Sequence, residues 1–396
     1  MTERLYYDDA YLWEFDAKIT RIRAGKQKGT WEAALSRSAF YPTSGGQPFD
    51  TGKLCFPGGE AAVTGVEADR EGEVWHTLDL EIQERTEVRG LIDGKRRTDH
   101  MEQHGGEHML AGAVWEKLRG TTIGLHLGQE DSTIDVTLPG ERTHLTEDEI
   151  FMLEDTVNER IRMDAPIRCW FPSAEELASL PLRKEPTVKE HVRVVAMGDF
   201  EMVACGGTHP SSTGRIGMLK ILSVIPAKGK ARISFVCGGR AAALFRKYMR
   251  CADKAGAALS CPVEKLSRAA SDLKSRLAEA ERKANRLASR ELTEQFRKAE
   301  SAGDLKGITL AAVTVEDMDP RAVSAAVSDY IAEKGKLLLL AAGERLTFAR
   351  SEDVPVDMAE LIRRVGRGGG RPELASGAGI PECVNVARKI LITEMK

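Results

Sequence analysis

Four side chains in the sequence have the types and spacing of metal ligands. His104 and His108 are four residues apart, so a helix would place both imidazoles on one face, within reach of one ion. Cys205 and His209 form a second pair, and two glycines in the spacer 206–208 let the backbone fold tightly because glycine accepts positive φ. A cysteine with three histidines favours zinc over magnesium or calcium. We therefore expect one Zn²⁺ per chain at these four residues.

Spacing alone leaves the role of this metal open. Four protein ligands would close a tetrahedral site, which is typical of a structural zinc that joins a helix to a strand. A weak fourth ligand or an expanded shell would instead leave room for water, whose pKa zinc can lower. His100 lies four residues before His104 and is a competing ligand on the same face. For the isolated His76, His144 and His191 we expect ordinary polar roles.

The composition is that of a folded protein with more than one domain. The 396 residues exceed the usual size of a single hydrophobic core, and 42% of them are hydrophobic against 30% charged. The first twenty residues lack an apolar signal region, and no apolar run approaches the length of a membrane span. Seven scattered cysteines indicate thiols in a reducing compartment. We expect a cytoplasmic protein without membrane association. The net charge of −3 neither implies nor excludes binding to nucleic acid.

The pattern of the first 240 residues predicts a barrel followed by an α+β domain. Residues 1–95 alternate short apolar stretches with turn clusters, which is typical of a small β-barrel-like domain. Residues 96–240 are expected to form the domain that contains the four ligands. They begin with a helix over 97–118, for which we expect Gly120 to be the C-cap. A second helix is expected over 146–163, and Thr146 with Glu149 has the pattern of a capping box at its start. Strand patterns between and after these helices complete the α+β architecture.

The remainder predicts a long helix and a separate C-terminal domain. Within residues 241–302, apolar positions over about 262–299 recur at alternating steps of four and three. This fits either a coiled coil or a helix packed on its own domain. Residues 303–396 alternate strand and helix patterns and are expected to form an α/β domain. A homodimer through the long helix or the C-terminal domain is a further expectation.

Several motifs together resemble a known family. They are residues 40–48 (Phe-Tyr-Pro-Thr-Ser-Gly-Gly-Gln-Pro) with 50–52 (Asp-Thr-Gly), then 103–108 (Gln-His-Gly-Gly-Glu-His) and 205–209 (Cys-Gly-Gly-Thr-His). In this order they resemble alanyl-tRNA editing proteins of the AlaX type and the editing domain of alanyl-tRNA synthetase. The glycine-rich stretch 366–377 resembles a DHHA1 domain. The long form of AlaX is therefore the description that the sequence resembles over nearly all of its length.

This resemblance implies a trans-editing hydrolase. Its substrate would be alanine tRNA that carries the wrong amino acid at the acceptor end, seryl as the first choice and glycyl as the second. His104, His108, Cys205 and His209 would be its zinc ligands. We expect the editing pocket to be lined by Thr43, Gly45, Gly46, Gln47, Gly105 and Thr208. Many relatives carry a hydroxyl residue where this chain has Gly105, which puts any selectivity assigned to that hydroxyl in question.

Two further groups of residues are candidates for substrate contact. His126, beside Gln129, matches a position at the pocket edge, where we expect a substrate-orienting role, with a loop histidine of no special role as the alternative. Arginines among the C-terminal glycines could donate to RNA phosphates, with solvated arginines in a turn as the alternative: Arg363, Arg364, Arg367 and Arg371. The resemblance to DHHA1 favours RNA.

Two rival functions follow from the same residues. In the first, the four ligands build a zinc-stabilised tRNA-binding module that has no turnover. In the second, the C-terminal domain belongs to a phosphoesterase, but the sequence lacks the upstream cluster of paired aspartates that such an enzyme needs. Because the editing signatures begin within the first fifty residues, we also expect no activation of amino acids.

Overall fold

The structure is a computed structural model that describes residues 1–188, 190–301 and 307–395. The chain forms two compact units, Met1–Cys251 and Ala252–Lys396. Both units mix helices and strands, so the predicted α+β class is confirmed. Within the described ranges, none of the helices combines the length and the apolar character that a membrane crossing needs.

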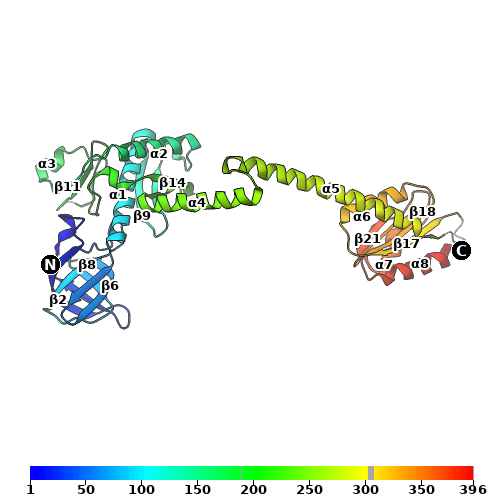
Figure 1. Ribbon diagram of the computed structural model, residues 1–396, viewed down its shortest axis with the longest axis horizontal. Coiled ribbons are helices and arrows are strands. Elements are labelled where there is room, and N and C mark those ends of the chain that lie inside the picture. Colours follow the sequence, from blue (N-terminus) through cyan, green and yellow to red (C-terminus); the bar gives the residue numbers. More distant parts are fainter. Residues whose placement is uncertain (189, 302–306, 396) are drawn as a thin grey trace. The chain divides into compact units, whose positions relative to one another are not determined.

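The first unit begins with a closed barrel of six antiparallel strands (Figure 1). Along its first strand, Phe15, Ala17 and Ile19 point into the barrel and alternate with exposed polar residues, as the two-residue period of a strand requires. In barrel order the strands are β2 (Glu14–Ala24), β3 (Trp31–Leu35), β7 (Val74–Leu78), β6 (Gly59–Ala68), β5 (Gly52–Phe56) and β8 (Glu87–Ile92). The short strands β1 (Glu3–Arg4) and β4 (Arg37–Ser38) pair with each other in parallel. The expected barrel is thereby confirmed.

Helix α1 (Gly94–Leu118) follows the last barrel strand directly. The side chain of Asp93 caps its start, where it accepts hydrogen bonds from two backbone N–H groups of the first turn. The expected C-cap at Gly120 was wrong. Arg119 adopts the left-handed conformation there, with φ 53°, and its N–H donates to carbonyl groups of the last helical turn.

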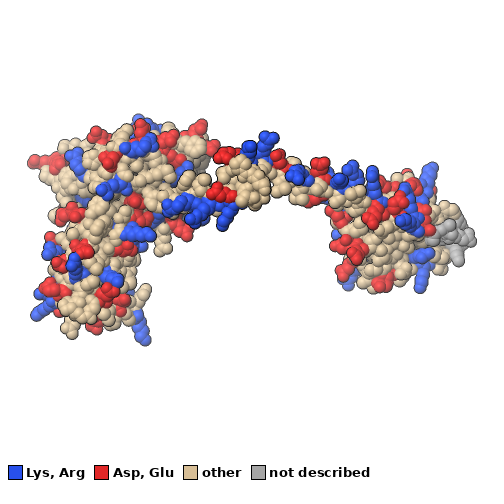
Figure 2. Space-filling model, in the orientation of Figure 1, with Lys and Arg blue, Asp and Glu red and all other residues tan. Residues whose placement is uncertain are grey.

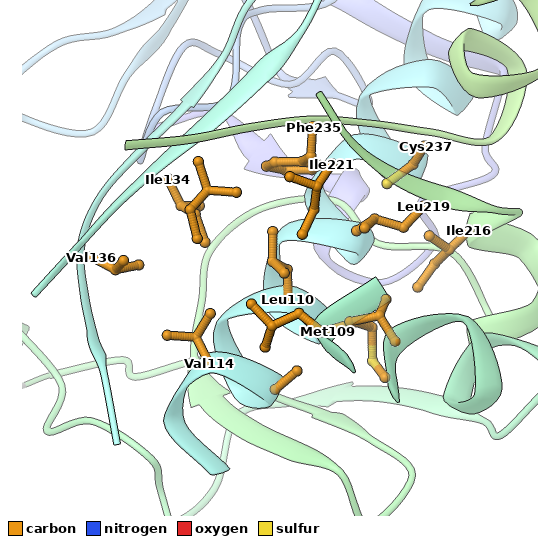
Figure 3. Close-up of a cluster of buried hydrophobic side chains, with 14 of the residues drawn as sticks. Met109, Leu110, Val114, Ile134, Val136, Ile216, Leu219, Ile221, Phe235 and Cys237 are labelled. Carbon is orange, nitrogen blue, oxygen red and sulfur yellow. The ribbon is translucent and has the colours of Figure 1, made fainter. Parts of the chain in front are cut away.

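A four-stranded antiparallel sheet and helix α2 (Glu147–Arg162) pack against α1. The sheet order is β14 (Leu219–Ala227), β15 (Lys230–Cys237), β10 (Ser132–Thr137) and β9 (Thr121–Leu127). Figure 3 shows how Met109, Leu110 and Val114 of α1 meet apolar side chains of the strands, among them Ile134 and Phe235. Thr146 and Glu149 form the predicted capping box of α2. This core fixes the helix that carries two of the candidate ligands.

A second, three-stranded sheet carries the other two candidate ligands at its end. Its strands are β11 (Ile167–Trp170), β12 (Val194–Met197) and β13 (Glu201–Ala204), and the short helix α3 (Ala174–Ser179) follows β11. Cys205 comes directly after β13. Its backbone N–H donates to the carbonyl of Arg193 at 2.9 Å, which ties the start of the ligand loop to the residue before the neighbouring strand.

Two helices follow the first sheet. Helix α4 (Gly238–Leu259) ends at a turn, and α5 (Leu266–Lys298) runs unbroken for 33 residues. The predicted long helix is therefore present. Its leucines Leu273, Leu277 and Leu287 are each more than half exposed.

The rest of the second unit is an α/β domain, as the sequence predicts. Its sheet runs in the order β16 (Glu300–Ser301), β17 (Thr309–Val315), β18 (Lys336–Ala342), β19 (Arg345–Arg350), β21 (Leu374–Ala378) and β20 (Arg367–Arg371). Helices α5 and α6 (Pro320–Ile331) pack on one face of the sheet, while α7 (Met358–Val365) and α8 (Glu382–Met395) pack on the other. The glycine-rich residues 367–371 form an edge strand, and not the turn that was considered as an alternative. A Cβ at Gly368 would lie 2.6 Å from the Cα of Gly377, so glycines allow this close pairing.

Candidate metal centre

The structure brings the four candidate ligands to one point. Their ligand atoms all lie within 4.8 Å of one another. The Sγ of Cys205 is 3.5 Å from the Nε2 of His104 and 3.3 Å from the Nε2 of His209. The rings of His104 and His108 stack with centroids 4.9 Å apart, as the four-residue spacing on α1 predicts. The four side chains therefore surround a space into which a single small ion would fit.

Burial keeps the three imidazoles neutral, which is the state that binds a metal. It lowers the pKa of His104 to about 3, with a further contribution from the nearby guanidinium of Arg193. Burial also holds the pKa of His108 and of His209 well below the usual range. Both ring nitrogens of His108 and the Nδ1 of His209 are buried without a hydrogen-bond partner among the described residues. Such unsatisfied nitrogens are expensive unless a ligand takes their lone pairs, so these residues fit a metal ion.

The thiol of Cys205 needs a cation to lose its proton. Desolvation raises its pKa to about 12, even though the N–H of Gly207 lies 3.4 Å from Sγ and favours the thiolate. A divalent metal among neutral imidazoles would replace that proton and hold the sulfur as thiolate. The donor set of one soft sulfur and three nitrogens is one that zinc prefers.

Gln47 of the barrel loop fixes the orientation of His104. The Oε1 of Gln47 accepts the backbone N–H of Thr208 at 3.1 Å, and this identifies it as the amide oxygen, because an N–H can only donate. The Nδ1 of His104, 2.9 Å from the same oxygen, must then carry its proton, which leaves Nε2 free for a metal. The Nε2 of Gln47 donates to the Oγ1 of Thr208 at 2.8 Å. Gln47 and Thr208 are both fully buried, so this network is closed to water.

The glycines between Cys205 and His209 serve close approach rather than positive φ. Neither is among the residues with positive φ, which corrects the conformational reason expected from the sequence. A Cβ at Gly207 would lie 2.2 Å from the Cε1 of His104, so only glycine leaves room for that ring. Gly206 is exposed and Cys205 partly exposed, whereas the three histidines are buried. The surface thus comes nearest to the cluster at residues 205 and 206.

Arg193 forms hydrogen bonds with the backbone of the loop that carries Cys205 and His209. Its Nη1 donates to the carbonyl of Cys205 at 3.1 Å and to that of Gly207 at 2.8 Å. The guanidinium carbon also lies 5.3 Å from the ring centroid of Tyr7, in cation–π contact. The Tyr7 hydroxyl is 3.6 Å from the position that a Cβ on Gly206 would take. Tyr7 thus lies beside the exposed side of the cluster.

Glu107 lies next to the ligands but outside the ligand group. Burial raises the pKa of its carboxyl to about 7, and the charge of Arg183 acts in the opposite direction. Its Oε2 is 3.5 Å from the Nδ1 of His108. Arg183 in turn pairs with the buried Glu201 at 2.7 Å. Glu107, Arg183 and Glu201 therefore form a mostly buried polar group next to His108.

The remaining residues expected in the pocket occupy different surroundings. Thr43 and Gly45 are exposed on the barrel loop, and Gly46, with φ 89°, lies where a Cβ would meet the carbonyl oxygen of Leu125 at 2.5 Å. Gly105 is buried against core residues: its Cβ would be 2.9 Å from Ile216. A larger residue at position 105 would therefore press on the core.

His126 and Gln129 are both exposed. His126 lies on strand β9 rather than in a loop, and it alternates with Leu125 and Leu127, which turn toward the core. Its ring thus points to the outer face of the sheet. Gln129 follows in the connection to β10. His100, the competing ligand, is buried but does not belong to the four-residue group.

The four arginines of the C-terminal stretch lie on two neighbouring elements. Arg363 and Arg364 lie in the last turn of α7, and Arg364 pairs with Glu394 of α8 at 2.8 Å. Arg367 and Arg371 lie on the edge strand β20, two residues on either side of Gly369. Strand alternation therefore places these two on the same face of the sheet.

The sequence did not single out two buried links to α1. Arg97 is fully buried and pairs with Asp50, the first residue of the Asp-Thr-Gly motif of the barrel. The side chain of Gln103 bonds to both backbone groups of Cys237, at 3.1 and 2.9 Å. Arg97 stands in a run of charged residues and gave no signal of burial, while Gln103 was noticed only as the first residue of the motif 103–108.

Comparison with known proteins adds an independent observation. Residues 192–234, which include Cys205 and His209, match the family model described as the second additional domain of threonyl and alanyl tRNA synthetases. The chain is 34% identical to alanyl-tRNA editing protein AlaX-L of Pyrococcus horikoshii, over 95% of this chain and 94% of the relative. The chain belongs to the AlaX-type alanyl-tRNA editing proteins. The predicted resemblance is thereby confirmed.

This AlaX-type protein is also similar to part of a larger enzyme. It is 31% identical to the alanine–tRNA ligase of Pyrococcus furiosus over 95% of its own length, which covers 42% of the ligase. Among solved structures, the exonuclease RecJ bound to manganese matches 35% of this chain and 37% of its own, with 15% identity. The TM-score of that match, 0.27, is too low to support any conclusion.

Proposed function

We propose that this editing protein hydrolyses the ester of alanine tRNA mischarged with serine, and less efficiently with glycine, at a zinc ion. The observation that carries the proposal is the convergence of His104, His108, Cys205 and His209, with buried nitrogens that lack partners, in a member of an editing family. As an AlaX-type protein the chain is an aminoacyl-tRNA hydrolase; the metal and the amino acid are the proposed parts.

The exposed side of the cluster suits an acyl group at the end of a tRNA. Gly206 faces solvent there, so the 3′ acceptor end can approach beside Cys205 without displacing the buried histidines. Tyr7 lies beside Gly206, and its hydroxyl accepts a hydrogen bond from Arg4 at 3.3 Å. The tyrosine ring can therefore flank and orient the incoming end. A bound zinc ion would polarise the ester carbonyl.

Selectivity for serine requires a polar contact with its hydroxyl, because a site built around that hydroxyl rejects the amino acid that lacks it. Thr43 on the exposed barrel loop is our candidate for this contact. Gly46 lies between that loop and the backbone of β9, so the loop is held close to the sheet: the N–H of Leu127 donates to the carbonyl of Gly46 at 3.1 Å. Gly105 faces the core, so it is not our candidate for this contact.

The test is deacylation of seryl-, glycyl- and alanyl-tRNA for alanine by the full chain. We expect multiple turnovers on the seryl substrate, slower turnover on the glycyl substrate and little on the correctly charged one. Cys205→Ala should abolish turnover and zinc binding while circular dichroism shows a folded chain. Absence of turnover on all three substrates by a zinc-loaded preparation would contradict the proposal.

One observation favours the alternative of a zinc-stabilised tRNA-binding module without turnover. All four candidate ligands come from the protein, and three of them are buried, as in closed structural zinc sites. This alternative predicts that Cys205→Ala unfolds the first unit, since the zinc would hold α1 to the loop after β13. A folded but inactive Cys205→Ala variant would exclude it.

We also propose roles for the segments around the centre. Residues 96–240 would form the editing domain, with the barrel of residues 1–95 supplying the pocket loop. The long-helix segment 241–302 would carry self-association through its exposed leucines, and the DHHA1-like domain of residues 303–396 would add contacts to tRNA. Arg367 and Arg371 on the open edge strand suit RNA phosphates better than Arg364, whose charge is already paired.

A further inference from the structure

Helix α4 carries a concentration of positive charge that the motifs do not explain. From residue 238 to residue 252 the sequence contains four basic residues and no acidic one, although the whole chain has a net charge of −3. Figure 2 shows Lys and Arg side chains gathered over this helix. The basic residues are Arg240, Arg246, Lys247 and Arg250. All four belong to the first unit, which also contains the candidate metal ligands.

These basic side chains share one side of the helix. At about 100° per residue, Arg246, Arg250, Lys247 and Arg240 fall within an arc of about 120°. Arg246, Lys247 and Arg250 are exposed and form no ion pair with any residue that the structure describes. Many other arginines of the same unit are paired with acids, including the fully buried Arg97. Three free cations of this unit thus lie together along about 6 Å of α4.

The start of α4 is fixed to the helix that carries two candidate ligands. Glu102 and Gln103 directly precede His104 on α1. The carboxylate of Glu102 accepts a hydrogen bond from the N–H of Gly239 at 2.9 Å. The side chain of Gln103 bonds to the backbone C=O and N–H of Cys237. Arg240 forms a two-point ion pair with Asp99 at 2.7 and 2.6 Å. These bonds fix the first turn of α4 beside α1, and Figure 1 shows the helix running from there away from α1.

We propose that the basic side of α4, formed by Arg246, Lys247 and Arg250, binds the phosphate backbone of the tRNA acceptor stem. The inference rests on the proposed function, because that function places the acyl end of the tRNA at the cluster. A duplex attached to that end has to continue away from the centre as a dense line of negative charge. Unpaired cations on a helix whose first turn is bonded to α1 offer the complementary charge, and contacts of this kind with phosphate position a substrate without reading its sequence.

The side of α4 opposite the cations raises a membrane as the rival partner. Phe245 and Tyr248 are both 61% exposed and lie across the helix from the cations. An amphipathic basic helix of this kind can also lie on an anionic membrane. RNA is the partner that the anchoring to α1 favours, and vesicles serve as a second arm of the test.

The experiment measures binding of deacylated alanine tRNA to the full chain over a range of salt concentrations. The triple variant Arg246→Gln, Lys247→Gln, Arg250→Gln removes the charges while it keeps good helix formers. We expect its salt slope, log Kobs against log [salt], to fall by about two to three and its Kd near 0.1 M salt to rise at least about fivefold. The double variant Arg246→Lys, Arg250→Lys keeps the charges and should bind like wild type.

A second triple variant controls for net charge. Lys26→Gln, Lys28→Gln, Lys53→Gln removes three exposed cations from the barrel and should leave the salt slope unchanged. An unchanged slope in the α4 variant, or equal losses in both triple variants, would overturn the proposal. So would binding of wild type to phosphatidylserine vesicles with no α4-dependent binding of tRNA.

Deacylation distinguishes this proposal from the proposed function. With seryl-tRNA, the α4 variant should show a raised KM, and the rise should be confined to substrates that carry the stem. A similar rise on a seryl-CCA trinucleotide would overturn the stem contact. If wild type binds tRNA through α4 but hydrolyses no substrate, the proposed function fails and the binding surface stands. If wild type turns over and the α4 variant keeps both its KM and its slope, the surface fails and the function stands.

Discussion

Replacement of Gln47 by leucine should weaken metal binding although Gln47 is not a ligand. The change removes the acceptor for the Nδ1 proton of His104 and both bonds to Thr208, at 2.9, 3.1 and 2.8 Å. Partners of this kind fix the tautomer and the direction of a ligating ring, and their loss costs about 10–100-fold in metal affinity. Three buried polar groups also lose their partner, at about 1–3 kcal/mol each, so the free energy of unfolding should fall by at least about 3 kcal/mol.

The assay is competition for zinc with a fluorescent chelator, together with urea unfolding of the same preparations. Gln47→Glu is the matched variant: its carboxylate still accepts from His104 and from the N–H of Thr208, and the Thr208 hydroxyl can rotate to donate to it. It should retain zinc affinity near that of wild type. The exposed Gln129→Leu controls for loss of an amide elsewhere. Unchanged zinc affinity in a folded Gln47→Leu variant would refute the positioning role of this residue.

Three further predictions concern parts of the fold away from the ligands. Burial lowers the pKa of His76 to about 4, below the 6.5 of the unfolded chain, so the unfolded state binds the proton first and stability is lost as the pH falls from about 6.5 to about 4. His76→Gln should reduce this acid sensitivity, by up to about 3 kcal/mol, in urea unfolding at pH 7 and pH 4.5. Asp50→Asn leaves the charge of Arg97 buried without its partner and should lower the free energy of unfolding by about 3–5 kcal/mol, measured in the same way at pH 7. Leu273→Glu with Leu277→Glu places charges on the exposed stripe of α5, and analytical ultracentrifugation should show a dimer in wild type and a monomer in the variant.

The sequence predicted the cluster of candidate ligands because each pair of them is local. His104 and His108 share a helical face whatever the rest of the fold does, and Cys205 and His209 share a short loop. The spacing within each pair does not show that the two pairs, a hundred residues apart, come together. That contact was expected from the order of the family motifs. The barrel and the helices followed from periodicity in the same way, since alternation and capping residues act over a few positions.

The details that the sequence missed depend on contacts between distant segments. Gln47 reads as part of a turn motif, and only the fold places its amide between His104 and Thr208. For residues 367–371 the sequence offered a turn as one reading, because glycine runs often mark turns; pairing with β21 makes them a strand instead. The cation side of α4 is visible in the sequence as an acid-free stretch, but only the structure shows that its charges are exposed and unpaired.

The central claim is that zinc at the four-residue cluster is required for hydrolysis of mischarged alanine tRNA. Its most direct test is the rate of seryl-tRNA deacylation by one metal-free preparation, titrated with zinc while bound metal is measured. We predict that the rate rises in proportion to bound zinc and reaches its plateau at one zinc per chain, and that His108→Ala, which lacks one of the ligands, gains neither zinc nor activity. Full activity in the metal-free chain, or zinc bound at one per chain without turnover, would contradict the account.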